Sequence, residues 1–303
     1  MRETHPKTYV LADRPVEAPR LAGGLHIVAT PIGNLRDISL RALETLAAAD
    51  TIACEDTRVA RKLLDRYGIN TPLVPYHEHN AAAARPKLLA RLADGASVAL
   101  ISDAGTPLVS DPGFKLVRTA RDAGHAVFAV PGASAALAAL TVAGLPTDRF
   151  FFEGFLPAKE GQRRSRIAEL EHIPATLVIY ESGPRLARTL ADLAAGLGAR
   201  EAAVCRELTK LHEEVRRGDL AQLAHDYTQG AETRGEIVIV VAPPSADAPP
   251  DANEVDAMLR NALRRASVKD AAAEVATATG LPRRDIYKRA IALADEADDG
   301  AAN

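Results

Sequence analysis

The chain has 303 residues, of which 47% are hydrophobic and 25% are charged, and its formal net charge is -3. A chain of this length and composition folds as an ordinary globular protein of two compact domains, with room for a small third one. The charge excludes a strongly basic protein, although a local basic face can still bind nucleic acid. The two cysteines, Cys54 and Cys205, each lie in an apolar run. This placement favours reduced core thiols, and therefore the cytoplasm, over a disulfide framework or a metal cluster.

The first 24 residues carry scattered charges without an apolar core, so they predict a disordered tail and not a signal peptide. From residue 25 to residue 148 short apolar runs alternate with longer helical ones, which predicts an N-terminal α/β domain with a mostly parallel sheet. Asp37 is the predicted N-cap of the first helix, whose apolar residues recur at helical spacing. The predicted strands cover residues 25–30, 51–54, 97–102 and 126–130.

A second α/β domain is predicted over residues 149–243, with strands at 175–181, 201–206 and 235–242. The last of these is a continuous apolar run, which is typical of a central strand. Residues 244–252 are rich in proline, alanine and aspartate and predict a linker. Residues 253–294 predict a helical module, and residues 295–303 a second disordered tail.

The helical module has the spacing of a helix-turn-helix motif. Ala276, Gly280 and Ile286 supply a small residue at the helix crossing, a glycine in the turn and an apolar anchor, and Pro282 suits the first turn of the following helix. The module therefore offers a positive surface suited to phosphates, or it is a plain three-helix cap that packs on the main body or on a partner subunit. Its exposed basic residues are predicted to include Arg283, Arg284, Lys288 and Arg289.

Four loops of the first domain follow predicted strands, and the carboxyl ends of parallel strands line the ligand crevice of such sheets. Gly105 and Gly132 let the backbone approach a ligand closely, because they have no Cβ. Asp103 is either a ligand contact or a turn aspartate, whereas Asp111 and Pro112 suit the start of the next helix. No Walker, G-x-G-x-x-G, zinc-binding or nucleophile-elbow motif is present. The loops cover residues 30–34, 55–58, 102–107 and 131–134.

Polar side chains in these loops are candidates for acid–base work. Glu55, Asp56 and Arg58 place two acids and a guanidinium within four residues, with Asp56 as the predicted cap of the next helix. His79 and Asn80 suit a polar loop that faces a substrate, because no further cluster of ligands supports a metal site.

The second domain supplies matching strand-end segments. Residues 180–182 and 206–210 are either surface polar residues or the second wall of the same cleft. The basic segment from Lys159 to Arg166 is either a solvated helix start or a contact for a phosphate backbone.

Several of these motifs together resemble the ribosomal RNA small subunit methyltransferase I family of the tetrapyrrole methylase superfamily. The resemblance runs in order from about Leu25 to Leu293, and its most specific block is Ser102–Gly113. Two positions depart from the family pattern: Ala133 replaces a frequent proline, and Gly183-Pro184-Arg185 lacks a histidine that many relatives have before the arginine. The other matching segments are residues 30–35, 55–58, 152–157, 180–182 and 206–210.

The resemblance implies a two-domain tetrapyrrole-methylase-like α/β fold with a C-terminal helical module. It further implies 2'-O-methylation of a decoding-site cytidine in 16S ribosomal RNA, with S-adenosylmethionine bound between the domains, no metal, and a homodimer. A methyl carried by a sulfonium is transferred in line, so the protein must align the donor and remove the hydroxyl proton. The candidates for the base or for positioning are Glu55, Asp56, Arg58, His79 and Glu181. Implied cofactor contacts are Ile32, Asp103, Ala104, Gly105, Thr106, Ser134, Ala135 and Tyr180.

Two alternative functions remain open at this point. A porphyrinoid or diphthamide methyltransferase would share the cofactor cleft without needing the basic helical module. A ligand-sensing regulator would instead use the helix-turn-helix on duplex DNA and leave the methyl group on the cofactor.

Overall fold

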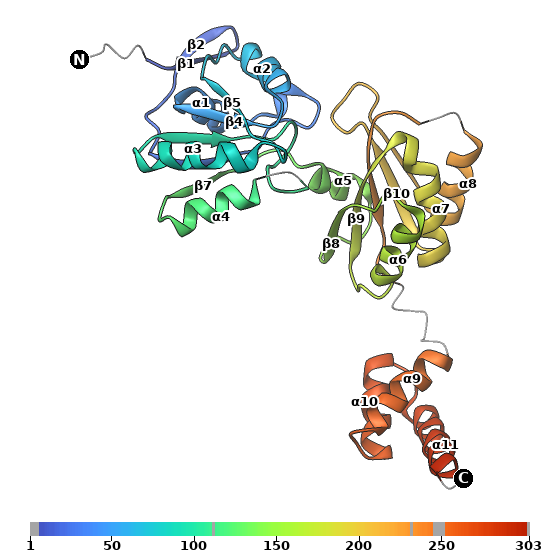
Figure 1. The fold of residues 1–303 in the computed structure, drawn as a ribbon. Coiled ribbons are helices and arrows are strands. Elements are labelled where there is room, and N and C mark those ends of the chain that lie inside the picture. Colours follow the sequence, from blue (N-terminus) through green and yellow to red (C-terminus); the bar gives the residue numbers. More distant parts are fainter. Residues whose placement is uncertain (1–5, 111–112, 231–232, 245–251, 302–303) are drawn as a thin grey trace. The chain divides into compact units, whose positions relative to one another are not determined.

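Two five-stranded sheets with the helices that pack on them, a small hairpin and a group of three further helices make up the computed structural model (Figure 1). It describes residues 6–110, 113–230, 233–244 and 252–301. The chain divides into two units, Met1–Pro244 and Ser245–Asn303. Both sheets belong to the first unit.

The first sheet is parallel throughout, as the alternating pattern predicts. Its strand order is β5-β4-β6-β3-β7, so chain segments cross over between neighbouring strands. The short strand β5 is missing from the prediction because three residues ending in a proline carry little strand signal. The strands are β3 (Gly24–Val28), β4 (Thr51–Cys54), β5 (Leu73–Pro75), β6 (Ser97–Leu100) and β7 (Val127–Val130).

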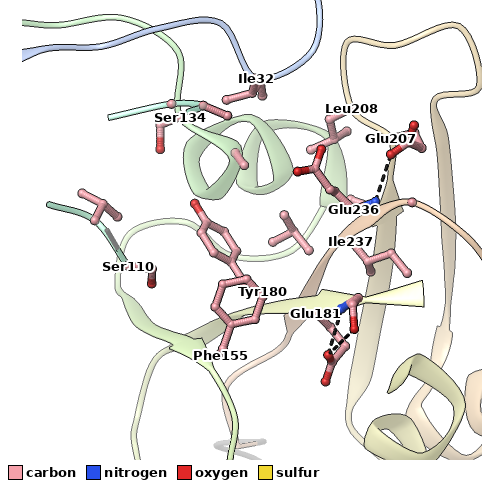
Figure 2. Close-up of a pocket in the computed structure, with 18 of the residues that line it drawn as sticks. Ile32, Ser110, Ser134, Phe155, Tyr180, Glu181, Glu207, Leu208, Glu236 and Ile237 are labelled. Carbon is pink, nitrogen blue, oxygen red and sulfur yellow. Dashed lines mark hydrogen bonds between the residues drawn. The ribbon is translucent and has the colours of Figure 1, made fainter. Parts of the chain in front are cut away.

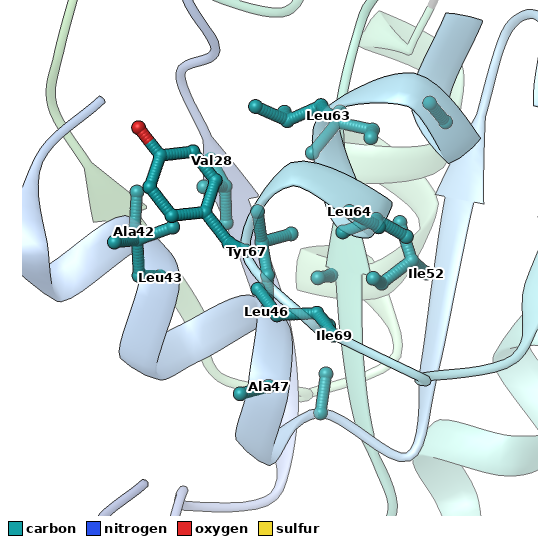
Figure 3. Packing of buried hydrophobic residues seen from close by; sticks show 14 of the residues in the cluster. Val28, Ala42, Leu43, Leu46, Ala47, Ile52, Leu63, Leu64, Tyr67 and Ile69 are labelled. Atoms are coloured by element: carbon teal, nitrogen blue, oxygen red, sulfur yellow. The ribbon is translucent and has the colours of Figure 1, made fainter. Parts of the chain in front are cut away.

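Helices cover both faces of this sheet because its strands are apolar on both sides. On β4, Ile52 packs with α1 (Leu40–Ala48) and α2 (Thr57–Arg66), as Figure 3 shows, and Cys54 belongs to the same cluster. Ala53, between them, faces the opposite cluster, formed with helices α3 (Ala81–Ala93) and α4 (Phe114–Asp122). In this doubly wound arrangement the carboxyl ends of all five strands lie at the same edge of the sheet.

The predicted cap at Asp37 is wrong. Asp37 ends a 3-10 turn, η1 (Leu35–Asp37), whose own cap is Asn34. The α-helix starts after this turn, where Ser39 Oγ accepts a hydrogen bond from the Ala42 backbone N–H at 3.1 Å. The extra turn displaces the cap by two residues.

The predicted N-terminal tail is wrong over the segment that forms a hairpin, β1 (Thr8–Leu11) with β2 (Arg14–Glu17). Tyr9 is only 3% exposed and belongs to the core cluster of α1 and α2. Lys7 Nζ donates to the last carbonyls of α1, those of Ala48 and Ala49, at 2.7 and 2.8 Å. Burial of Tyr9, together with the contacts of Val16 and Lys7, thus holds in place a segment that the sequence analysis predicts to be disordered.

The second sheet is mixed, with strand order β11-β10-β12-β9-β8. Only β8 and β9 pair in parallel, and β12 lies in the middle, which confirms the predicted central strand. Helices α6 (Glu160–Leu170), α7 (Leu186–Leu197) and α8 (Leu220–Gln229) pack on one face. The strands are β8 (Phe150–Phe155), β9 (Thr176–Ser182), β10 (Glu201–Arg206), β11 (Glu214–Asp219) and β12 (Glu236–Val241), and η2 (Gly183–Arg185) follows β9.

Helix α5 (Ala135–Ala143) joins the two halves. It directly follows β7 of the first sheet, yet its Ala139 and Leu140 pack against Val178 and Cys205 of the second sheet. Ile32, from the loop after β3, belongs to the same apolar cluster. The halves therefore share a core and form one unit.

The helical module contains α9 (Ala252–Leu263), α10 (Val268–Thr279) and α11 (Arg283–Ala301). Gly280 ends α10 with a left-handed φ of 69°, and Ile286 is 3% exposed, which confirms the predicted turn and anchor. Pro282 stands just before α11 instead of inside its first turn. The predicted tail from residue 295 is helical as far as Ala301.

Residues 245–251, most of the predicted linker, lie outside the described residues. Among the helices that the structure describes, none is long and apolar enough to cross a membrane.

Candidate functional site

The loops that follow β3, β6 and β7 are fastened to one another at the carboxyl edge of the first sheet. Thr30 and Gly105 exchange two backbone hydrogen bonds of 2.8 and 3.0 Å. Thr106 Oγ1 donates to the carbonyl of Ala133 at 3.2 Å. These cross-links hold three loops as one wall, as expected of strand ends in an open parallel sheet.

This wall borders a cavity of about 340 Å³ between the two halves of the first unit, here called the first cavity (Figure 2). Every residue named above as an implied cofactor contact lines it, and so does Glu181. Its lining is Ile32, Asp103, Ala104, Gly105, Thr106, Val109, Ser110, Ser134, Ala135, Phe155, Tyr180, Glu181, Ser182, Cys205, Glu207, Leu208, Lys210, Gly235, Glu236, Ile237 and Val238.

Tyr180 is the main aromatic side chain of this cavity. Its hydroxyl accepts a hydrogen bond of 3.2 Å from the Ala136 backbone N–H, in the first turn of α5. Its ring meets the rings of Phe152 and Phe155 edge to face, with centroids 4.9 and 5.6 Å apart. The ring is therefore held at a fixed angle against the cavity.

On the opposite wall one lysine is paired with two glutamates. Lys210 Nζ donates to Glu207 Oε1 at 2.8 Å and also bonds Glu236 (Figure 2). Glu207 and Thr209 both have positive φ, of 51° and 67°, a conformation that non-glycine residues adopt at a cost and that is common at functional sites. These positions favour the interpretation of residues 206–210 as the second wall of the cleft over their interpretation as surface polar residues.

Two contacts join the rims of the cavity. The backbone N–H of Asn34 donates to Thr209 Oγ1 at 3.1 Å, which links the halves on one side. On the other side Ser110 approaches Gly154, where an added Cβ would lie 2.7 Å from the serine oxygen. Only a glycine at position 154, with its φ of 74°, leaves room for this approach.

Phe155 and the segment 235–238 are lining residues that the sequence analysis does not predict. Glu236 pairs with Ser182 because β12 runs antiparallel to β9, so the start of β12 lies beside the end of β9. Apolar character alone does not give a strand's direction. Because β12 departs from the parallel pattern, the sequence analysis does not predict this part of the cavity wall.

Glu181 lines the cavity, but its carboxylate is fully engaged. Thr189 Oγ1 donates to one oxygen at 2.7 Å. The Ser182 backbone N–H donates to the other at 2.8 Å (Figure 2). The Arg185 guanidinium lies 3.2 Å from the same carboxylate, whose side chain is entirely buried. A carboxylate held in this way orients the strand end, and both of its oxygens already accept hydrogen bonds.

Asp56, Arg58 and His79 do not line the first cavity. Asp56 caps α2 and binds Arg58, and the hydrogen bonds from Arg58 lower the pKa of Asp56 to about 2. His79 is exposed and touches only His77 by ring contact, while Asn80 binds the backbone of its own turn. The predicted acid–base cluster is therefore divided between structural and exposed residues.

Glu55 lines a second cavity of about 600 Å³, next to the first one. Burial and the nearby charges of Asp103 and Asp56 raise its pKa, although His77 acts in the opposite direction. Asp103 itself accepts a hydrogen bond of 3.0 Å from the Asp56 backbone N–H. Ser110 borders both cavities, so the cavity of Glu55 and the first cavity share one loop.

The remaining predictions concern residues away from the cavity. Asp111 and Pro112 lie outside the described residues; α4 begins at Phe114, with Gly113 at the cap position. In the basic segment 159–166, the arginines pair with acids such as Glu153 and Asp192, so these arginines are not free to bind a phosphate backbone.

Cys54 and Cys205 are free and buried, as predicted, and burial raises the pKa of their thiols to about 12 and about 11. Within the ranges that the structure covers, no group of three or more metal-ligating side chains comes together.

Comparison with known sequences gives a consistent result. Residues 24–224 match the family model of the Tetrapyrrole (Corrin/Porphyrin) Methylases, and residues 249–294 match that of the RsmI C-terminal HTH domain. A Mesorhizobium japonicum protein named Ribosomal RNA small subunit methyltransferase I is 52% identical over 94% of this chain and 97% of its own length. A protein of the same name from Erythrobacter litoralis is 53% identical over 91% of this chain and 97% of its own length.

Solved structures show the same fold at low sequence identity. Diphthine synthase has a TM-score of 0.55 at 18% identity, over 72% of this chain and 89% of its own. A cobalt precorrin-4 methyltransferase has a TM-score of 0.54 at 16% identity, over 72% of this chain and 94% of its own.

Proposed function

The chain belongs to the ribosomal RNA small subunit methyltransferase I family of the tetrapyrrole methylases, and from this premise we propose that it methylates the 2'-hydroxyl of a decoding-site cytidine in 16S ribosomal RNA. It is an S-adenosylmethionine-dependent methyltransferase. We place the reaction in the cytoplasm, on RNA assembled in the 30S subunit.

The observation that carries this proposal is the convergence of all eight implied cofactor contacts on the first cavity. Its volume of about 340 Å³ lies in the usual range for small-molecule sites. Apolar side chains such as Ile32 and Leu208 suit the adenine ring, and the Asp103 carboxylate suits hydroxyl and ammonium groups. The residues present therefore fit S-adenosylmethionine, which supplies an electrophilic methyl group when bound.

Among the acid–base candidates, the contacts favour Glu55 as the proton acceptor. Asp56 has a strongly lowered pKa, Glu181 is saturated with donors, and His79 lines neither cavity. Glu55 has no hydrogen bond to another described residue, and its raised pKa makes it a stronger base than an ordinary carboxylate. In the proposed step the Glu55 carboxylate takes the 2'-hydroxyl proton as the ribose oxygen bonds to the methyl carbon and the carbon–sulfur bond breaks.

The alternative functions are not favoured. A porphyrinoid or diphthamide methyltransferase does not account for the match of residues 249–294 or for relatives above 50% identity that carry a ribosomal RNA name. A regulator that senses a ligand does not need a carboxyl group with a raised pKa beside the cofactor cavity.

The decisive experiment supplies purified protein with methyl-labelled S-adenosylmethionine and 30S subunits from cells that lack the modification. We expect label on a single cytidine ribose of 16S RNA, located by nuclease digestion and mass spectrometry. Subunits that already carry the modification are the matched control and should accept no label. Absence of label on the unmodified subunits would refute the proposed reaction, and parallel reactions with naked 16S RNA define whether assembly is required.

We also propose that the protein acts as a homodimer. Leu137 and Val142 of α5 support this proposal because these apolar side chains are 54% and 42% exposed in the single chain. Sedimentation equilibrium should give twice the mass of the chain, and a monomer at micromolar concentration would contradict the proposal.

A further inference from the structure

The second cavity lies beside the first, and one loop with unusual backbone geometry lines both. Leu108 borders the second cavity, Val109 the first, and Ser110 both. Leu108 and Ser110 have φ values of 73° and 60°, in the left-handed region that such residues rarely adopt. Backbone conformations of this kind are common at ligand sites. Here successive side chains of the loop border two different cavities.

An exposed aromatic side chain lines the second cavity. Phe114, in the first turn of α4, is 63% exposed although most large apolar side chains of this unit are buried. Nucleic-acid enzymes use such rings to stack an unpaired base, since every base has a flat face.

Two cationic groups of the same cavity form no ion pair with an acid that the structure describes. The Nε of Arg85, on α3, is buried and has no hydrogen-bond partner within the part of the chain that the structure describes. Lys115 follows Phe114 and forms no ion pair with any described acid. A buried donor without a partner calls for a ligand or water, and guanidinium groups match the geometry of phosphate oxygens.

From these observations we infer that the second cavity holds the acceptor nucleotide, with its base stacked on Phe114 and a flanking phosphate bound by Arg85 and Lys115. This inference rests on the proposed function, because it gives the RNA acceptor a position beside the donor cavity. Glu55 lines the same cavity, so a nucleotide there would have its ribose on the side of the proposed proton acceptor. A nucleotide acceptor must leave its stack to reach such a pocket.

The test uses the full-length protein in the 30S methylation assay with Phe114→Ala and Arg85→Ala. Each change should raise the KM for 30S subunits by about tenfold, since loss of one stacked base or one phosphate contact weakens binding to this degree. The Kd for S-adenosylmethionine, measured by calorimetry, should stay within about twofold. Phe114→Tyr should leave the KM at the wild-type value, because tyrosine keeps the aromatic ring.

Matched controls are Phe128→Ala and Lys87→Ala, which remove an exposed ring and an exposed cation that line neither cavity. If the Phe114 and Arg85 variants behave like these controls while the wild-type protein is active, the inference is wrong.

A second measurement separates this inference from the proposed reaction. Irradiation of the protein with unmodified 30S subunits at 254 nm, followed by peptide mapping, should place the main RNA cross-link at Phe114. A cross-link there with no methyl transfer would retain the nucleotide pocket and reject the reaction. Cross-links that map only to other peptides would overturn the pocket.

Discussion

At the scale of single residues, Asp103 connects the two cavities, because it lines the first and raises the pKa of Glu55 at the second. Asp103→Ala should raise the Kd for S-adenosylmethionine by at least about tenfold, since a hydrogen bond to a charged group is worth roughly 1.5–3 kcal/mol. Calorimetry measures this change, and circular dichroism checks that the variant is folded. Unchanged affinity would remove Asp103 from the cofactor site.

Glu55 should determine the acidic limb of the pH profile. A carboxylate base works only when deprotonated, and the folded pKa of Glu55 is raised above 4.5 by burial and by Asp103. Methylation at saturating cofactor should therefore fall as the pH drops through this raised pKa, and Glu55→Gln should remove most activity at every pH. Asp103→Asn should shift the limb to lower pH. An acidic limb that survives in Glu55→Gln would assign the base to another group.

Asp192 on α7 should be important for stability. Its carboxylate is buried and binds both Arg163, at 2.6 Å, and Arg164, at 2.8 Å. Asp192→Ala leaves the buried Arg163 without its partner and should cost about 3–5 kcal/mol of unfolding free energy in urea melts. Asp122→Ala, which breaks an exposed pair with Arg118, should cost less than about 1 kcal/mol. Equal losses in the two variants would contradict this assignment.

The stability from Asp192 should also depend on pH. Burial alone would raise the pKa of this carboxyl, but hydrogen bonds from Arg164 and Arg163 outweigh burial and hold it below 3.8. A pKa that is lower in the folded state stabilises the protein at neutral pH, and this contribution is lost as the pH falls below about 4. The urea midpoint of the wild-type protein should fall over that range more steeply than that of Asp192→Ala.

At the scale of elements, the hairpin of β1 and β2 should stabilise the first sheet. Tyr9 is buried against the α1 and α2 cluster, so Tyr9→Ala should lower the unfolding free energy by about 3–5 kcal/mol. Val10→Ala on the same strand removes a half-buried side chain and should cost less. A melting temperature unchanged by Tyr9→Ala would mean that the hairpin adds nothing to the core.

The parallel sheet and the helical turn were predictable because the spacing of apolar residues and the residue types at strand ends are local properties of the sequence. The hairpin and the antiparallel direction of β12 were not, since both depend on contacts between distant segments. The same distinction holds for the site. Asp103–Thr106 follow a recognisable strand, whereas Phe155 and Ile237 reach the cavity only through the pairing of the second sheet.

The acid–base residues show a third case. Glu55 and Asp56 are neighbours with the same functional group, and the sequence separates them only by predicting Asp56 as the cap of the helix that follows. Only the Arg58 hydrogen bonds to Asp56 and the partial burial of Glu55 give them opposite pKa shifts. A side chain's role in proton transfer is thus determined by its folded environment.

At the scale of the whole molecule, the two units should contribute separately to donor and acceptor binding. The first cavity lies wholly within Met1–Pro244, so a fragment of residues 1–244 should bind S-adenosylmethionine with an unchanged Kd.

Arg283, Arg284 and Lys288 of α11 are exposed and form no ion pair with described residues, whereas Arg289 binds Asp256. Losing these three cations should raise the KM for 30S subunits roughly tenfold and flatten its salt dependence.

Full-length protein with alanine at those three positions is the companion to the fragment. It should reproduce most of the change in KM while the module keeps its helical signal. A fragment that methylates 30S subunits as well as the full chain would limit the module to a structural role.

The path of α5 also determines an order of events during synthesis. This helix is made with the first sheet, but the strands that bury it are complete only at Val241, nearly a hundred residues later. At usual rates of translation its apolar face waits about 5–20 s for its partners. The donor cavity, which needs both walls, is therefore among the last features of the first unit to form, and the nascent chain cannot hold S-adenosylmethionine there until then.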